Sequence, residues 1–203
     1  MRNRLYYHLQ LHRLIYKYQF GFRHNHSTTL AVIDVIDNIY ERLDNGEKVI
    51  GLYFDLQKAF DTVNHEILLY KLEKLGVRGI VHDWFKNYLT DRYQYTFCNA
   101  VKSGMMKIDC GVPQGSVLVP LLFLLYMNNI SAALPDQKIK LFADDTNLFI
   151  SGKNLSEVSE LAADCIGKLS EWFTANKLTL NIDKTCFMVS PPDKTNSVAL
   201  CIN

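Results

Sequence analysis

The chain has 203 residues, of which 48% are hydrophobic and 21% charged, and its formal net charge at pH 7 is +1. This length and composition are those of one ordinary globular domain with a sizeable core, and they exclude a low-complexity chain. The most apolar run, residues 117–127, is too short to cross a bilayer, and the basic N-terminus lacks the apolar segment of a signal peptide. We therefore expect neither secretion nor membrane insertion.

Charge is distributed unevenly along the chain. A total of +1 argues against a strong nucleic-acid binder, because phosphate-binding proteins usually carry a clear basic excess. The first acidic residue, however, is Asp34. Five basic residues precede it: Arg2, Arg4, Arg13, Lys17 and Arg23. This segment is either a surface for nucleic acid or a solvated helix face, and charge alone leaves both interpretations open.

The cysteines predict free thiols. There are five, at positions 98, 110, 165, 186 and 201. The number is odd, and no two have the short spacing of a zinc knuckle or a redox motif. We expect reduced, mostly buried thiols and, with no targeting signal, an intracellular protein.

The first half of the chain predicts three helices and one strand. In chain order these are a helix over residues 30–43, a strand over 48–55 (KVIGLYFD), and helices over 65–75 and 80–89. Ser27 and Thr28 are candidate caps for the first helix, which ends at Asn45-Gly46. The strand ends in an acid, so it places the carboxylate of Asp55 at its C-terminal end.

The second half predicts an α+β arrangement. In chain order we expect a hairpin of residues 93–98 and 105–110 around Ser103-Gly104, a GVPQGS loop, an apolar helix from about Ser116, strands over 138–143 and 146–151, a helix over 155–176, and strands over 185–190 and 198–202. Pro120 is tolerated only in the first turn of its helix. Helices and strands are mixed, with an antiparallel hairpin at the centre and helices packed behind it, which is typical of the α+β class.

Asp144-Asp145 is an unexpected pair for the turn between two strands. Such a turn usually has Asn-Gly or Asp-Gly, whereas two adjacent carboxylates repel each other. Mg²⁺ prefers oxygen ligands, and a catalytic magnesium site typically uses one to three carboxylates. If the strand that ends at Asp55 lies beside this hairpin, three carboxylates converge, and two metal ions roughly 3.5–4 Å apart would offset their repulsion. A solvated turn is the simpler alternative for the pair taken alone.

Five segments resemble, in order, the motifs of reverse transcriptases. They are QFGFRHNHST (19–28), YFDLQKAFDTVNH (53–65), GVPQGSVLVPLLFLLYMNNI (111–130), LFADDTNLF (141–149) and LTLNIDKT (178–185). The first resembles a fingers motif and the others palm motifs, and the form they resemble most is that of non-LTR retrotransposons. The resemblance implies a right-hand polymerase palm, a ferredoxin-like antiparallel sheet with helices packed behind, together with partial fingers.

The resemblance implies four catalytic residues. Asp55 and Asp144 are implied as metal ligands, and Asp145 completes the metal-binding set. Lys184 is implied to protonate or shield the leaving pyrophosphate. A solvated surface charge is the alternative for this lysine when the surrounding motif is set aside.

Four further residues are implied to bind substrate. Arg23 matches an arginine that contacts the triphosphate, a role suited to a planar, permanently charged fork. Phe60 matches an aromatic gate that fills the space a ribose 2′-hydroxyl would need, and a core phenylalanine is the alternative. Gln114 and Gly115 match residues under the incoming nucleotide and the template base, and a ligand-free Gly/Pro loop is the alternative.

The function implied is RNA-directed DNA synthesis with two Mg²⁺ ions, or Mn²⁺ in their place, on an RNA template, a DNA primer and a dNTP. We expect one reverse transcriptase domain fragment, with residues 1–47 as partial fingers and 48–203 as a palm that lacks the end of the primer grip and the thumb. One alternative is a catalytically inert remnant that keeps the fold. Another is a different palm-type two-metal enzyme, an RNA-dependent RNA polymerase or a nucleotide cyclase, against which Phe60 argues.

Overall fold

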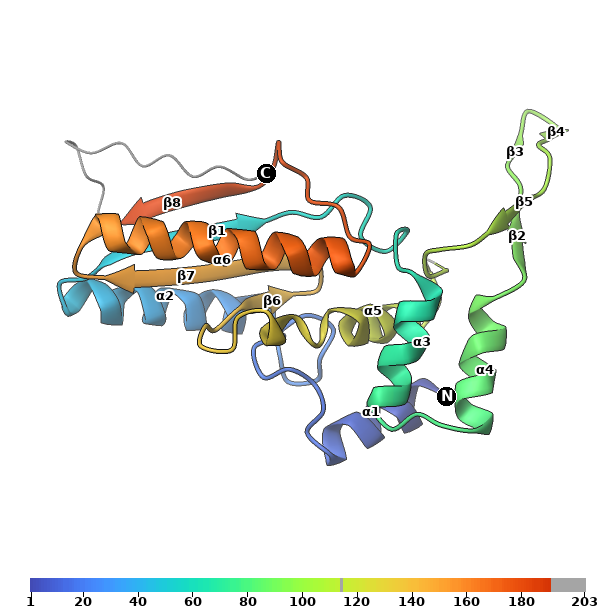
Figure 1. Cartoon of the computed structure of the whole chain (residues 1–203). Helices are drawn as coiled ribbons and strands as arrows, with labels where there is room; N and C mark the ends of the chain where they lie inside the picture. The colour runs from blue at the N-terminus through green and yellow to red at the C-terminus, as the bar shows by residue number, and fades with distance from the viewer. Residues whose placement is uncertain (114, 191–203) are drawn as a thin grey trace.

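The centre of the molecule is a four-stranded antiparallel sheet (Figure 1). In sheet order its strands are β6 (Lys140–Phe142), β7 (Asp145–Gly152), β1 (Lys48–Phe54) and β8 (Cys186–Ser190). The computed structural model describes residues 1–113 and 115–190, so the strand predicted over 198–202 lies outside the described residues. The first of these four strands along the chain lies between the third and the fourth, which is the ferredoxin-like order, as predicted.

The helices follow the predicted order. They are α1 (Arg2–Leu11), α2 (Thr28–Asp44), α3 (His65–Lys74), α4 (Ile80–Leu89), α5 (Val119–Met127) and α6 (Leu155–Ala175), with the 3₁₀ turn η1 (Ile130–Ala132) after α5. The helix α1 was not predicted. It contributes Leu5, Tyr6 and Leu9 to the core. The helix predicted from about Ser116 begins at Val119, which leaves Pro120 in its first turn.

The strand β1 has hydrogen-bonded partners on both sides because its sequence is apolar on both faces. Apart from Lys48 and Tyr53 its side chains are fully buried. Phe54 lies opposite Thr146 of β7, and Tyr53 lies opposite Cys186 of β8. This register brings the C-terminal end of β1 to the beginning of β7.

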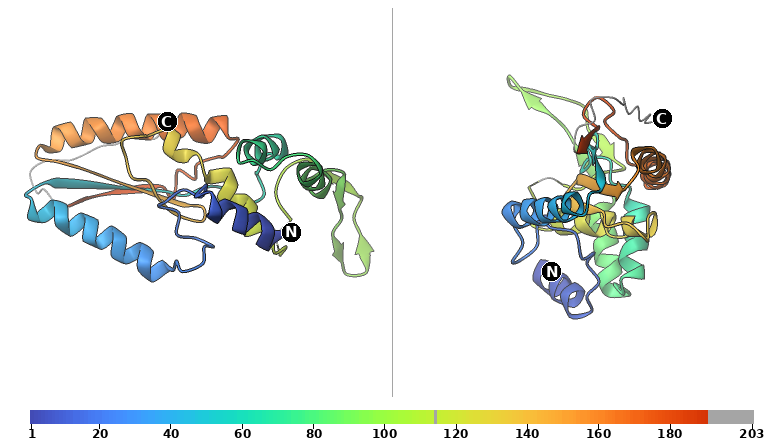
Figure 2. Two further views of the ribbon diagram at one scale, coloured as in Figure 1. Left: turned by 90° about the horizontal axis from the view of Figure 1, so that it is seen from below. Right: turned by 90° about the vertical axis from the view of Figure 1, so that its left-hand side faces the viewer.

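Helices cover both faces of the sheet, and Figure 2 shows α6 on one side and α2 on the other. Seven apolar side chains of α6 are buried: Leu155, Val158, Ala162, Cys165, Ile166, Leu169 and Phe173. The helix α2 begins behind Ser27, whose side chain accepts a hydrogen bond from the Leu30 N–H at 3.2 Å. It is tied to the sheet edge by an ion pair between Asp34 and the buried Lys140. The prediction that helices pack behind the sheet is therefore correct for α6, whereas α2 occupies the opposite face.

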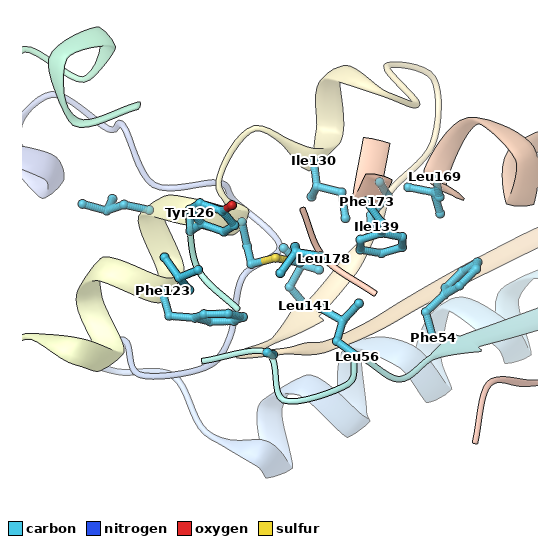
Figure 3. Packing of buried hydrophobic residues seen from close by; sticks show 14 of the residues in the cluster. Phe54, Leu56, Phe123, Tyr126, Ile130, Ile139, Leu141, Leu169, Phe173 and Leu178 are labelled. Atoms are coloured by element: carbon cyan, nitrogen blue, oxygen red, sulfur yellow. The ribbon is translucent and has the colours of Figure 1, made fainter. Parts of the chain in front are cut away.

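Three of the other helices, α3, α4 and α5, form a group at one end of the sheet (Figure 1). Eight of the nine residues of α5 are buried, which is why its sequence is apolar on all sides rather than along one stripe. In Figure 3 Phe123 and Tyr126 of α5 lie beside Leu56 and Leu141 in the same core. The hydrophobic core therefore continues past the end of the sheet that carries Asp55.

An arm of paired strands projects from α4, away from the rest of the molecule (Figure 2). It consists of β2 (Arg92–Gln94) paired with β5 (Met106–Ile108), and β3 (Phe97–Cys98) paired with β4 (Val101–Lys102). The predicted turn at Ser103-Gly104 is wrong, because the chain reverses at Asn99-Ala100. Both of these residues have positive φ, 47° and 63°, a conformation that the sequence does not signal because Ala100 stands where such turns usually have glycine.

The cysteines differ from the prediction in their burial. Of the four cysteines in the described residues, Cys98, Cys110 and Cys186 are exposed and only Cys165 is buried, so the prediction of mostly buried thiols is wrong. All four are free, as predicted. No helix in residues 1–113 and 115–190 is both long and apolar enough to cross a membrane.

Candidate active site

Asp55 is the first residue after β1, one position beyond the end of the strand. Its backbone N–H donates to Thr185 Oγ1 at 3.3 Å, and its carbonyl accepts from the Asn181 N–H at 2.8 Å. The Asn181 side chain donates to the Asp55 carboxylate, with 2.9 Å between Nδ2 and Oδ2. Both the backbone and the carboxylate of Asp55 are therefore fixed by the segment that precedes β8.

The turn between β6 and β7 consists of Ala143 and Asp144, not of Asp144-Asp145 as predicted. Asp145 already belongs to β7, where it lies opposite Phe142. Ala143 takes the positive φ of the turn, 57°. Thr146 steadies the turn, because its hydroxyl donates to the Asp144 carbonyl at 3.4 Å.

The pairing of β1 with β7 brings the two acidic segments together. Phe54 lies opposite Thr146, so the next position on each strand sets Asp55 against Asp145. Side chains that lie opposite each other on antiparallel strands point to the same face of the sheet. Asp144 is the neighbour of Asp145 in the turn. The structure therefore gathers the three predicted carboxylates at one end of the sheet.

The surroundings of Asp145 shift its pKa. The pKa of Asp145 is raised, chiefly because part of its environment excludes water, and then by the negative charges of Asp144 and Asp55. Within the described residues, no group of three or more His, Cys, Asp or Glu side chains is arranged as a ready-made metal cluster. The three acids are thus close enough to affect the pKa of Asp145, but their side chains are not arranged around a common metal position.

The segment after α6 supplies two residues that the sequence analysis missed, Asn181 and Thr185. Within residues 178–185 the resemblance assigns a role only to Lys184, whereas the structure shows that Asn181 and Thr185 hold Asp55. They also hold each other, since the Thr185 hydroxyl donates to the Asn181 carbonyl at 2.8 Å. Lys184 itself is exposed in this segment. No local pattern signals the role of Asn181, because this residue lies 126 positions from Asp55 in the sequence.

The beginning of the GVPQGS loop is joined to the turn that follows β1. The Gly111 N–H donates to the Val63 carbonyl at 2.7 Å, and the Val112 N–H donates to the Phe60 carbonyl at 2.9 Å. Gly111 has a φ of +84°, and a Cβ at this position would lie 2.7 Å from the Asp61 carbonyl oxygen. Glycine is therefore required there, because the two backbone segments approach too closely for a side chain.

The predicted substrate-binding residues have different surroundings. Phe60 is half-buried, and its ring packs on that of Phe123 with 4.3 Å between the centroids. Gly115 has a φ of +86° and open space where a Cβ would lie. Gln114 lies outside the described residues.

Arg23 is bound to its own loop. Its Nη1 donates to the carbonyls of Tyr16, Lys17 and Gln19 at 3.2, 3.3 and 3.0 Å. The Nε atom is buried without a hydrogen-bond partner among the described residues. In this structure the guanidinium therefore organises the loop between α1 and α2 rather than facing the three carboxylates.

The donor chemistry of the three acids suits a hard divalent cation such as Mg²⁺, which binds oxygen ligands and retains several waters. A cation would also relieve the repulsion that raises the pKa of Asp145. Asp55 has one oxygen engaged by Asn181, so it enters such a site with its orientation already set. With a cation bound, such a site would be suited to stabilising negative charge that develops on a phosphoryl group.

Comparison with known sequences places the chain among retroelement polymerases. Residues 1–199 match the family described as reverse transcriptase (RNA-dependent DNA polymerase). The chain is 30% identical to the RNA-directed DNA polymerase from mobile element jockey of Drosophila melanogaster, over 91% of this chain and 21% of that protein. It is 31% identical to the probable RNA-directed DNA polymerase from transposon BS of the same species, over 86% of this chain and 20% of that protein. The chain thus spans about a fifth of the length of these relatives.

Solved structures support the same fold. An apo telomerase from Candida tropicalis, truncated from its C-terminal domain, superposes with a TM-score of 0.69 at 15% identity, over 96% of this chain and 41% of that one. A Candida albicans telomerase in complex with a TWJ fragment of telomeric RNA also gives 0.69 at 15% identity, over 98% of this chain and 36% of that one. The chain therefore belongs to the reverse transcriptase (RNA-dependent DNA polymerase) family, in the form found in non-LTR retrotransposons.

Proposed function

We propose that this chain forms the catalytic part of an RNA-directed DNA polymerase, which transfers a deoxynucleotidyl group from a dNTP to a primer 3′-hydroxyl on an RNA template. The observation that carries the proposal is the convergence of Asp55, Asp144 and Asp145, from segments about 90 residues apart in sequence, at one end of a ferredoxin-like sheet. Nothing in the packing of the sheet requires three acids there. Their mutual repulsion is instead a cost that a bound cation would remove.

We propose that these three carboxylates hold Mg²⁺, two ions when substrate is bound, with Mn²⁺ as a substitute. When bound, the metal ions lower the pKa of the attacking hydroxyl and neutralise charge on the leaving pyrophosphate. Asn181 keeps Asp55 in place for this task. Residues 1–47 would belong to the fingers and the rest of the chain to the palm.

Other residues of the chain would bind the nucleotide. Arg23 would exchange the carbonyls of its loop for the triphosphate, since phosphate is the stronger partner for a guanidinium. Lys184 is exposed within the segment that holds Asp55, which suits a lysine that shields pyrophosphate. Gln114 and Gly115 would contact the nucleotide and the template base from the loop that Gly111 fixes.

Primer extension on an RNA template tests the proposal. With Mg²⁺ present, we expect the chain to extend a DNA primer with dNTPs in preference to NTPs, and Asp144→Ala to abolish the extension while the protein remains folded by circular dichroism. Absence of extension by folded wild-type protein would favour an inert remnant that keeps the fold. Extension with NTPs as efficient as with dNTPs would favour another palm-type polymerase.

Phe60 should govern the choice of sugar. Its ring is half-buried on Phe123, so Phe60→Leu retains apolar packing while it removes the flat ring edge. We expect the ratio of NTP to dNTP incorporation to rise by roughly tenfold or more, the usual value of a contact in an apolar pocket. The measurement is kcat/KM for one dNTP and the matching NTP. An unchanged ratio together with lower thermal stability would make Phe60 a core residue only.

A further inference from the structure

Gln19 is a buried polar residue whose side chain reaches the turn between β6 and β7. It is only 1% exposed. Its Oε1 accepts hydrogen bonds from the Gly21 N–H at 2.8 Å and from the Ala143 N–H at 3.1 Å. Its Nε2 donates to the Ala143 carbonyl at 3.4 Å. One amide side chain therefore pairs with both backbone polar groups of the first turn residue.

The backbone around Gln19 reinforces this contact. The Phe20 N–H donates to the Leu141 carbonyl at 2.8 Å, and the Leu141 N–H donates to the Tyr18 carbonyl at 2.9 Å. Gln19 thus forms a parallel bridge with Leu141 at the open edge of β6. The segment acts as a short additional strand on the hairpin that carries the acids.

Gly21 shows how close this approach is. A Cβ on Gly21 would lie 2.3 Å from the Ala143 backbone nitrogen, a separation that no side chain allows. The loop before α2 therefore presses its backbone against the turn itself. Arg23 holds the same loop from the other side through the Gln19 carbonyl.

The turn needs such support because Ala143 has a φ of 57°. A non-glycine residue in the left-handed region is strained, and the strain persists only where the surroundings over-determine the conformation. Asp144 and Asp145 follow Ala143 directly, so rotation of the Ala143 peptide would redirect both carboxylates. The Gln19 amide opposes that rotation by binding both ends of the residue.

We propose that Gln19 is a positioning residue, whose amide fixes the Ala143 peptide and thereby directs the carboxylates of Asp144 and Asp145 toward Asp55. The consequence for catalysis rests on the proposed function, whereas the effect on the turn does not. The Gln19 side chain is buried against the turn. It acts through the backbone of the turn, at a distance of one residue from the first acid.

The test begins with the turn and uses no substrate. Gln19→Met keeps the length and apolar volume of the side chain but removes its hydrogen bonds. Hydrogen exchange measured by NMR should be about tenfold faster or more at the Ala143 and Gly21 amides, the loss expected for one hydrogen bond, and unchanged in α6. Gln94→Met is the control, because Gln94 is an exposed glutamine on β2 of the arm, away from the turn.

A second change separates positioning from general stability. We expect Gln19→Met to bind Mn²⁺ several-fold more weakly than the wild type. Ala143→Gly removes the penalty for positive φ, so the double variant with Gln19→Met should recover this affinity. If Gln19→Met does not fold, Gln19→Asn keeps an uncharged amide but is one methylene shorter, so it should lose the hydrogen bonds to Ala143 and accelerate exchange there in the same way.

The outcomes distinguish the two proposals. Wild-type exchange rates at Ala143 in Gln19→Met would overturn the role of Gln19, whatever the metal results. Faster exchange at Ala143 together with loss of Mn²⁺ affinity and recovery in the double variant supports it. Faster exchange in a protein whose wild type binds no Mn²⁺ would leave the support of the turn intact and refute the proposed function instead.

Discussion

Replacing Asp55 by asparagine is expected to reduce metal-dependent primer extension by about 10³-fold or more. Removing a carboxylate ligand forfeits several kcal/mol of transition-state charge stabilisation, and each ~1.4 kcal/mol corresponds to a factor of ten in rate. The fold should tolerate the change. An asparagine keeps a side-chain oxygen that accepts from Asn181 Nδ2, and the backbone bonds to Asn181 and Thr185 do not involve the side chain of residue 55.

The measurement is kcat for single-nucleotide addition at saturating Mg²⁺, with thermal unfolding recorded on the same samples. Asp37→Asn is the matched control, because Asp37 is an exposed acid on α2 and loses the same charge. The control should retain wild-type kcat. Equal losses in both variants, or a normal rate in Asp55→Asn, would remove Asp55 from the site.

Lys71 on α3 is a charged group in an apolar setting, and it should make stability depend strongly on pH. It is 9% exposed, and its Nζ donates to the Tyr126 carbonyl. The ammonium lies 4.6 Å from the centroid of the Tyr126 ring and 4.9 Å from that of Trp172. In the described part of the chain no ion pair joins it to a carboxylate. Burial lowers the pKa of Lys71 to about 7.

The sign of the effect follows from this lowered pKa. Between about pH 7 and the ordinary lysine pKa of 10.5, the unfolded chain binds one more proton than the folded chain. The free energy of unfolding should therefore rise with pH in that window, by up to ~1.4 kcal/mol per pH unit. Below pH 7 lysine is protonated in both states, and this dependence disappears. Tyr126 does not interfere, since burial raises its pKa above 10.

Lys71→Met should abolish most of this slope and stabilise the protein at neutral pH. Urea unfolding at pH 7.5 and 9.0 is the measurement, and the wild type should gain about 2 kcal/mol between these values. Lys74→Met, on the exposed side of the same helix, should keep the wild-type slope. If the free energy of unfolding of Lys71→Met still rises with pH as in the wild type, groups other than Lys71 cause the pH dependence.

Much of the fold could be predicted because local patterns and tertiary packing agree. The stripe of α6, the Ser27 cap of α2 and the apolar run of β1 each give a period or a boundary that the structure follows. The arm was misjudged because its reversal at Asn99-Ala100 contains no glycine, whereas Ser103-Gly104 imitates a turn. The placement of α2 on the second face of the sheet depends on contacts such as Asp34 with Lys140, which no local period encodes.

In the candidate site, the acids could be predicted from the sequence and the residues that hold them could not. Asp55, Asp144 and Asp145 could be proposed from sequence because acids at a strand end and in a turn violate ordinary preferences. Their supports could not. Asn181 and Gln19 act through hydrogen bonds to residues more than 120 positions away, and only the folded chain brings the partners together. The role that the resemblance implies for Arg23 stays a prediction, since its hydrogen bonds to nearby carbonyls show only how it is held in its loop.

The convergence of three acids on a divalent cation is tested most directly by titrating Mn²⁺ into ¹⁵N-labelled protein and following the paramagnetic loss of amide signals. We expect the amides of residues 55, 144, 145 and 181 to broaden first, and this pattern to vanish in Asp55→Asn. Broadening that begins elsewhere, or that is the same in Asp55→Asn as in the wild type, would contradict a metal site at this end of the sheet.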